Sequence, residues 1–206
     1  KNESKFVKRW VNSMREADEI TVLDTGSDDD TVRLLKECGV RVESAVLHPF
    51  RFDVARNLSM DMVAEDADIC VCTDLDEVFV PGWRAAMEKA WRDGVKTLKY
   101  RYTWSFSDDG SEGYVFWIGK THARRGFRWV HPVHEVLEYE GGEPLQAYAV
   151  GVQLNHYPDS SKPRSSYLPL LELSVKERPD DDRNVHYLGR EYMYYRMYDR
   201  AIETLK

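Results

Sequence analysis

The chain has 206 residues, of which 42% are hydrophobic and 32% are charged, a composition typical of a globular domain with an ordinary core. Its length suits one domain, or one domain with an appendage. The net charge of −7 disfavours bulk attraction to nucleic acid or to an anionic membrane, while leaving room for a local basic pocket. No apolar run approaches the ~18 residues of a membrane span, and no signal peptide is visible.

The cysteines are too few for a disulfide framework or a complete zinc site. Cys38, Cys70 and Cys72 all lie in apolar or helical surroundings, so we expect buried free thiols and a reducing, cytoplasmic compartment. The sequence starts at Lys1 without an initiator methionine, and we expect a trimmed chain or a fragment.

The first half of the chain alternates helices and strands. Apolar residues at three- and four-residue steps predict a helix over residues 3–17. Strands are predicted at 20–23 and 40–42, with a short helix between them at 32–38. A strand, a helix and a strand within about twenty residues favour a parallel sheet with right-handed crossovers.

The second half changes character. Residues 97–106 alternate between apolar and polar side chains and predict a strand, onto which the aromatic-rich segment 114–118 returns antiparallel. Further short strands are predicted near 127–130, 133–139 and 149–154, and helices from about Arg164 onward. The pattern predicts an α/β fold with a mostly parallel central sheet, helices on both faces, a smaller antiparallel portion and C-terminal helices.

A short apolar run at 70–72 ends in the carboxylates Asp74, Asp76 and Glu77. Ligands of open α/β sheets lie just past the carboxyl ends of the strands. Divalent ions such as Mg²⁺ take few protein carboxylates and share the remaining positions with water and substrate phosphates. The stretch therefore suits a metal–diphosphate site, and it suits equally well a polar strand end that runs into a helix cap.

Other polar loops follow predicted strands, and their residue types suit a nucleotide diphosphate. Carboxylates can hold ribose hydroxyls or a base edge, and an arginine can neutralise phosphate. Each residue also has a plainer interpretation. Asp24 can simply cap a turn, Arg56 can pair with Asp53, and His156 can pack on Tyr157.

Six motifs in this order resemble family 2 glycosyltransferases of the GT-A fold, and the resemblance covers roughly the whole chain. It is nearest to bacterial and phage members that carry tetratricopeptide repeats. The motifs are Lys-Asn-Glu (1–3), Val-Leu-Asp-Thr-Gly-Ser-Asp-Asp-Asp-Thr-Val (22–32), Phe-Asp-Val-Ala-Arg-Asn (52–57), Thr-Asp-Leu-Asp-Glu (73–77), Val-His-Glu (133–135) and Asn-His-Tyr (155–157).

The resemblance implies an inverting sugar transfer from a nucleotide-diphospho-sugar, with a UDP-sugar favoured. It places Asn2 and Glu3 beside the nucleotide and Asp24 against the base or ribose. It places Asp53 and Arg56 on the uracil and phosphate side.

The resemblance also implies Mn²⁺ or Mg²⁺ at the acidic stretch. Asp76 and His156 match the metal ligands, and Asp74 lies nearer the ribose. Glu135 is the candidate general base that would deprotonate the acceptor.

We expect a GT-A catalytic domain over residues 1–160, with its first strand missing before Lys1. Residues 161–206 are expected to be helical and to contain a partial tetratricopeptide-like repeat, since Leu188, Gly189, Tyr192 and Ala201 have the required spacing. A plain helical pair is the alternative. Such helices could bind a protein partner or a second copy.

Two other functions compete with sugar transfer. A nucleotidyltransferase would use similar carboxylates, although the Gly-rich basic phosphate loop expected of it is not visible. A non-catalytic nucleotide-sugar-binding module with a helical docking surface is the other alternative. The acceptor is open among a saccharide, a lipid-linked saccharide, a peptide and a modified nucleic acid, and no integral membrane segment is expected.

Overall fold

The computed structural model describes residues 1–159 and 167–206. The chain forms two compact units, each built from three segments. The first unit comprises Lys1–Val46, Leu58–Arg128 and Tyr139–Ser160, and the second comprises Leu47–Asn57, Trp129–Glu138 and Ser161–Lys206. The domain boundary expected between residues 160 and 161 lies outside the described residues.

Helices and strands alternate along the described chain as the α/β pattern predicts. The helices are α1 (Val7–Met14), α2 (Thr31–Glu37), α3 (Phe52–Asp61), α4 (Trp83–Ala90), α5 (Tyr167–Glu177), α6 (Asp182–Tyr194) and α7 (Tyr198–Leu205). The strands are β1 (Thr21–Asp24), β2 (Arg41–Ser44), β3 (Ile69–Val71), β4 (Glu77–Phe79), β5 (Thr97–Thr103), β6 (Val115–Ala123), β7 (Phe127–Val130), β8 (Val136–Tyr139) and β9 (Gln146–His156). The α/β fold class is confirmed.

The main sheet of the first unit has the strand order β3-β6-β5-β9-β4. Strands β3, β5 and β9 run in one direction, and β6 and β4 run in the other. The antiparallel return of the aromatic-rich segment onto the preceding strand is confirmed by the β5–β6 pairing. Strands β1 and β2 form a separate parallel pair, and β7 and β8 form another two-stranded sheet.

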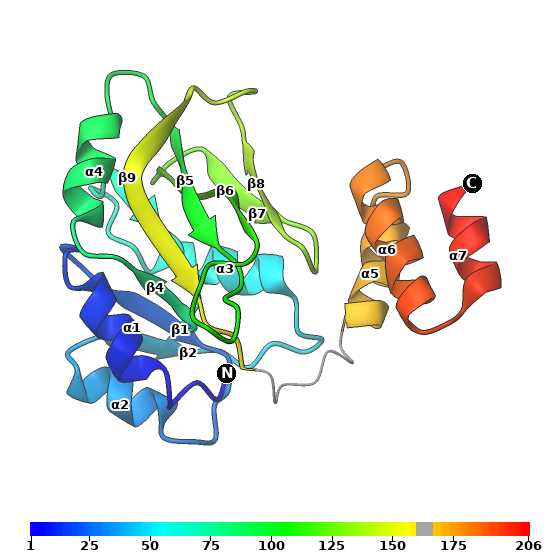
Figure 1. The fold of residues 1–206 in the computed structure, drawn as a ribbon, viewed down its shortest axis with the longest axis horizontal. Helices are drawn as coiled ribbons and strands as arrows, with labels where there is room; N and C mark the ends of the chain where they lie inside the picture. Colours follow the sequence, from blue (N-terminus) through cyan, green and yellow to red (C-terminus); the bar gives the residue numbers. More distant parts are fainter. Residues whose placement is uncertain (160–166) are drawn as a thin grey trace. The chain divides into compact units, whose positions relative to one another are not determined.

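The core of the first unit lies between its sheet and its helices. Alternation along β5 buries Leu98, Tyr100 and Tyr102 on one face, because successive strand residues point to opposite sides. Helix α4 packs on β9 and contributes the buried Trp83, and α1 contributes Trp10 (Figure 1). These aromatic side chains pack between the sheet and the helices and hold in place the strands that carry the candidate site.

Two local expectations are wrong. The acidic stretch does not run into a helix, because Glu77 begins strand β4, which pairs antiparallel with the end of β9. Cys38 is exposed at the C-terminal end of α2, whereas Cys70 is buried as expected. Burial raises the pKa of the Cys70 thiol to about 11.

The second unit contains the C-terminal helices and a separate apolar cluster. Val133, Leu171, Leu188 and Tyr192 are buried in this cluster. Helix α6 begins after Asp181, whose carboxylate accepts a hydrogen bond from the Asn184 backbone N–H at 3.0 Å, as an N-cap residue does.

The predicted helical character of the tail is confirmed from Tyr167, and its predicted start near Arg164 lies outside the described residues. No described helix combines the length and the hydrophobicity that crossing a membrane requires.

Candidate active site

The acidic stretch forms a tight turn between β3 and β4. The backbone N–H of Glu77 donates to the carbonyl of Asp74 at 3.0 Å. In return, the Asp74 backbone N–H donates to the Glu77 carboxylate at 2.9 Å. The indole N–H of Trp10 donates to the Thr73 hydroxyl at 3.1 Å and ties the start of the turn to α1. The turn is thus held at both ends.

Glu77 is the buried anchor of this turn, with 1% of its surface exposed. Its Oε1 accepts a hydrogen bond from the Tyr102 hydroxyl at 2.7 Å and contacts the Lys120 ammonium at 2.6 Å. The Lys120 ammonium also contacts Asp74 Oδ2 at 3.1 Å. Burial, together with the neighbouring Glu77, raises the pKa of Tyr102 far above its usual value. A buried carboxylate without partners would be costly, so these bonds stabilise the turn.

Asp76 and His156 meet beside this anchor. The β4–β9 pairing sets Glu77 opposite His156, and the Tyr157 backbone N–H donates to the Asp76 carbonyl at 2.8 Å. As a result, His156 Nε2 lies 3.4 Å from Asp76 Oδ2. Strand register thus joins two residues that are far apart in the sequence.

The His156 ring packs on Trp104 and not on Tyr157. Its centroid lies 4.5 Å from the Trp104 ring, and its Nδ1 donates to the Trp104 carbonyl at 3.0 Å. Burial acts to lower the pKa of His156, but the contacts with Asp76 and the Trp104 carbonyl outweigh it and raise the pKa. Because a carbonyl only accepts, Nδ1 carries a proton and Nε2 faces Asp76.

The Asp76–His156 pair fits a divalent ion that is shared with a substrate. Among the described residues, no three or more His, Cys, Asp or Glu side chains are grouped to hold an ion by themselves. An ion that keeps water and substrate phosphates needs only one or two protein ligands, and a neutral imidazole with its other nitrogen bonded to a carbonyl is a suitable one. The two side chains supply one carboxylate oxygen donor and one imidazole donor.

Asp24 caps the turn that follows β1. Its carboxylate accepts hydrogen bonds from the backbone N–H groups of Gly26 and Ser27 at 3.0 and 2.9 Å, and from the Ser27 hydroxyl at 2.5 Å. Gly26 has a φ of +92°, a conformation that glycine adopts without the strain of a side chain. The contacts of Asp24 are therefore those of a residue that caps a turn.

Asn2 and Glu3 bind the same loop from the N-terminal side. The Asn2 backbone N–H donates to the Ser27 hydroxyl at 2.8 Å, and its side-chain amide donates to Asp28 at 2.6 Å. The Glu3 backbone N–H donates to the Thr31 hydroxyl at 2.8 Å. These residues hold the loop between β1 and α2 in place.

The other predicted site residues belong to the second unit. Arg56 pairs with Glu135 at 3.0 Å, and both side chains are largely buried, with 14% and 13% exposed. Asp53 pairs with Arg51 at 2.8 Å. The alternative pairing of Arg56 with Asp53 is therefore wrong. Both ion pairs, Arg51–Asp53 and Arg56–Glu135, lie within this unit.

Three residues around the acidic turn carry little signal in the sequence. Lys120 is a lone lysine in an aromatic-rich segment, and Tyr102 is one of several alternating aromatic residues. Trp104 packs on His156 and keeps 49% of its surface exposed. Only strand pairing brings these side chains to Asp74 and Asp76, so no local pattern could have identified them.

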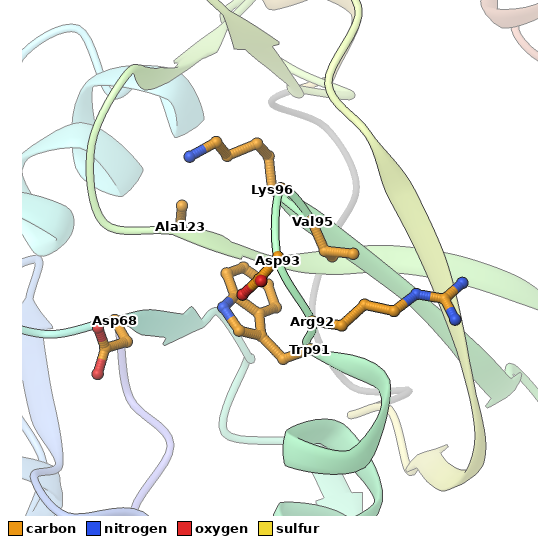
Figure 2. A pocket seen from close by; sticks show the side chains of 8 residues that line it. Asp68, Trp91, Arg92, Asp93, Val95, Lys96 and Ala123 are labelled. Atoms are coloured by element: carbon orange, nitrogen blue, oxygen red, sulfur yellow. The ribbon is translucent and has the colours of Figure 1, made fainter.

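A cavity of about 330 Å³ opens at the other end of the main sheet (Figure 2). Asp68 precedes β3 and Lys96 precedes β5, so the cavity lies where these strands begin, whereas Asp74 and Asp76 follow the end of β3. No predicted site residue lines the cavity, and it is therefore not the candidate active site. It is lined by Asp68, Trp91, Arg92, Asp93, Gly94, Val95, Lys96 and Ala123.

The chain is similar to known proteins in its fold and in its sequence. A mycobacterial protein of known crystal structure superposes with a TM-score of 0.51 over 82% of this chain and 67% of its own, at 18% sequence identity, which shows a shared fold. A search of curated proteins finds no match. The profile of glycosyl transferase family 2 matches residues 1–134, a range that includes Asp24, Asp74 and Asp76 and stops one residue before Glu135. The match covers well over half of the chain, which therefore belongs to glycosyl transferase family 2 and has an α/β architecture consistent with the GT-A fold.

Proposed function

We propose that this chain is an inverting, metal-dependent glycosyltransferase that takes its sugar from a nucleotide-diphospho-sugar, with a UDP-sugar favoured. The observation that carries the proposal is the pairing of Asp76 with His156 at 3.4 Å, beside a turn locked by Glu77, in a chain of glycosyl transferase family 2. The acceptor remains to be chosen among a saccharide, a lipid-linked saccharide, a peptide and a modified nucleic acid.

Asp76 and His156 would hold Mn²⁺ or Mg²⁺. When bound, such an ion supplies positive charge against the charge that develops on the leaving diphosphate. Asp76 offers a carboxylate oxygen, and the Trp104 carbonyl keeps the His156 ring oriented with Nε2 toward Asp76. Asp74, which is half exposed and contacts Lys120, would accept hydrogen bonds from the ribose.

The loop after β1 would contact the base or ribose through Asp24. A carboxylate has about four acceptor positions, and the Gly26 and Ser27 donors use three of them at Asp24. One position is left for a hydroxyl or base donor of the nucleotide. Asn2 and Glu3 support the proposal because they hold this loop in one conformation.

Glu135 would act as the general base. Its carboxylate would take the proton of the acceptor hydroxyl while the acceptor oxygen bonds to the anomeric carbon and the bond from that carbon to the diphosphate oxygen breaks. Arg56 contacts Glu135 Oε1 at 3.0 Å and would orient the carboxylate. Asp53 and Arg56 already have protein partners, so their contacts to uracil and phosphate would be made in exchange for, or in addition to, these ion pairs.

We also propose that the C-terminal helices form a tetratricopeptide-like repeat that binds a protein partner or a second copy. The positions with the repeat spacing, Leu188, Tyr192 and Ala201, are buried. A Cβ atom on Gly189 would lie 2.5 Å from the Leu205 side chain, so the glycine permits close packing of α6 on α7. The location that we expect for the protein is the cytoplasm.

The deciding experiment is a donor screen with the whole chain. UDP- and GDP-sugars are first ranked by thermal shift, because a ligand that binds only the folded state raises its stability. Release of UDP or GDP is then measured with and without Mn²⁺. Mn²⁺-dependent hydrolysis of a UDP-sugar supports the proposal.

Two other results would favour a different function. Tight nucleotide binding with no turnover of any donor favours the binding module. Release of a sugar 1-phosphate, with the nucleoside monophosphate transferred, favours a nucleotidyltransferase.

A further inference from the structure

We infer that Lys120 is a positioning residue that keeps Asp74 out of the metal shell and so leaves the ion to Asp76 and His156. The inference rests on the proposed function, because it concerns the same ion. It explains why two aspartates only two positions apart would serve different purposes.

The Lys120 ammonium is fixed next to Asp74. It lies 2.6 Å from Glu77 Oε1 and 3.1 Å from Asp74 Oδ2, and 14% of its side chain is exposed. Its own carbonyl accepts a hydrogen bond from the Cys72 backbone N–H at 2.9 Å, directly before the acidic turn. Both the backbone and the charged end of this lysine are therefore bound to the segment that carries the aspartates.

Glu77 keeps the ammonium from moving away. Its side chain is 1% exposed, and a buried carboxylate that loses its cationic partner becomes an uncompensated charge. Rotating Lys120 toward solvent would leave Glu77, within the described part of the chain, with the neutral Tyr102 hydroxyl and the Asp74 backbone N–H. The ammonium thus stays between Glu77 and Asp74.

Asp74 is the member of this group that could otherwise turn toward the ion, since 47% of its side chain is exposed. The Lys120 ammonium competes with a divalent cation for the same Asp74 oxygen, and its positive charge disfavours a cation at that position. An ion with two protein ligands keeps more positions for diphosphate oxygens and water.

The test measures Mn²⁺ binding by the protein without nucleotide, from the electron paramagnetic resonance signal of the free ion. In the unaltered chain, Asp76→Asn should weaken binding at least about tenfold, whereas Asp74→Asn should change it less than about twofold. Equal losses from both substitutions would overturn the inference. This comparison needs no change at Lys120.

A second comparison uses a variant in which the contact between Lys120 and Asp74 is removed. The double variant K120M/E77Q removes one positive and one negative charge, so the net charge of the site is unchanged. The side-chain amide that E77Q introduces can accept from the Asp74 backbone N–H through its oxygen and can donate to the Tyr102 hydroxyl through its nitrogen. In this background Asp74→Asn should weaken Mn²⁺ binding about fivefold or more. A change below twofold in a variant that unfolds at the normal temperature would contradict the role of Lys120.

Failure of the proposed function gives a different result. If Asp76→Asn and His156→Ala leave Mn²⁺ binding unchanged, the metal site itself is wrong, whatever Asp74 does. If those two substitutions weaken binding and Asp74→Asn does so equally, the metal site stands and only the role of Lys120 fails.

Discussion

The two units hold their charged site residues in different ways. In the first unit, the strand register sets Glu77 opposite His156, and a carboxylate with 1% exposure is bonded by Tyr102 and Lys120. In the second unit, Arg56 and Glu135 meet through their side chains, with 14% and 13% exposed. A site fixed by backbone pairing has little freedom, whereas an ion pair between side chains can open to admit a proton or a phosphate.

This difference matches the chemistry proposed for each group. Metal ligands need a constant separation, which strand pairing gives to Asp76 and His156. A general base must exchange a proton with an acceptor, which the side-chain contact between Arg56 and Glu135 allows. Variants in the two units test this contrast.

Asp76→Asn should abolish Mn²⁺-dependent donor turnover, with a loss of about 10⁴-fold or more, because several kcal/mol of charge stabilisation disappear with the ion. The measurement is release of UDP from a UDP-sugar, with circular dichroism to show that the fold is kept. Asp68→Asn is the matched control, since Asp68 lies at the other end of β3 and should leave turnover unchanged. An Asp76→Asn variant with normal Mn²⁺ dependence would remove Asp76 from the site.

Glu135→Gln should reduce transfer by about 10²–10⁴-fold while sparing UDP binding, because it removes the proton acceptor and keeps the shape. Transfer is measured as kcat and UDP binding by calorimetry. Glu138→Gln is the control within the same unit, because Glu138 pairs with Arg178 and has no proposed catalytic role. Near-normal transfer by Glu135→Gln would show that another group acts as the base.

Truncation of a core side chain should destabilise mainly the unit that contains it. Leu98 and Leu171 are almost fully buried in separate apolar clusters, so Leu98→Ala and Leu171→Ala should each lower the free energy of unfolding by about 2–5 kcal/mol. Hydrogen exchange should show faster opening of β5 in the first variant and of α5 in the second. Leu145→Ala, at a position with 56% exposure, should have little effect. Equal acceleration in both units by either core variant would contradict this expectation.

Tyr102→Phe should lower the free energy of unfolding by about 1–3 kcal/mol, because it removes a hydrogen bond to the buried Glu77 carboxylate. Urea denaturation provides the measurement. Tyr114→Phe, at a residue with 65% of its surface exposed, is the control and should be nearly neutral. The same small effect from both substitutions would show that Glu77 does not depend on the hydroxyl.

Arg178→Ala should have the smallest effect, less than about 1 kcal/mol of unfolding free energy. Its partner Glu138 lies at 2.6 Å, but about 40% of each side chain is exposed, and water screens such pairs. Denaturation in low and high salt would measure the contribution. A loss comparable to that of Tyr102→Phe would remove the contrast between buried and exposed charge pairs.

Local patterns predicted most of the elements because the apolar period itself specifies them. The alternation from residue 97 predicts β5, and the apolar steps near the N-terminus predict α1. Strand β4 was missed because three residues, Glu77–Phe79, give too short a pattern, and its pairing partner β9 lies far along the chain. A charged residue at the start of a buried strand also contradicts the usual apolar pattern.

The amino-acid pattern was enough to predict the α/β class, and the resemblance of its ordered motifs to family 2 glycosyltransferases identified Asp74, Asp76, Glu135 and His156 as candidates. Only the tertiary structure showed that Asp76 contacts His156 and that Arg56 pairs with Glu135 and not with Asp53. It also decided that Lys120 and Tyr102 surround Glu77. These contacts depend on which strands become neighbours and in which register, and this is set by packing of the whole chain and not by any local segment.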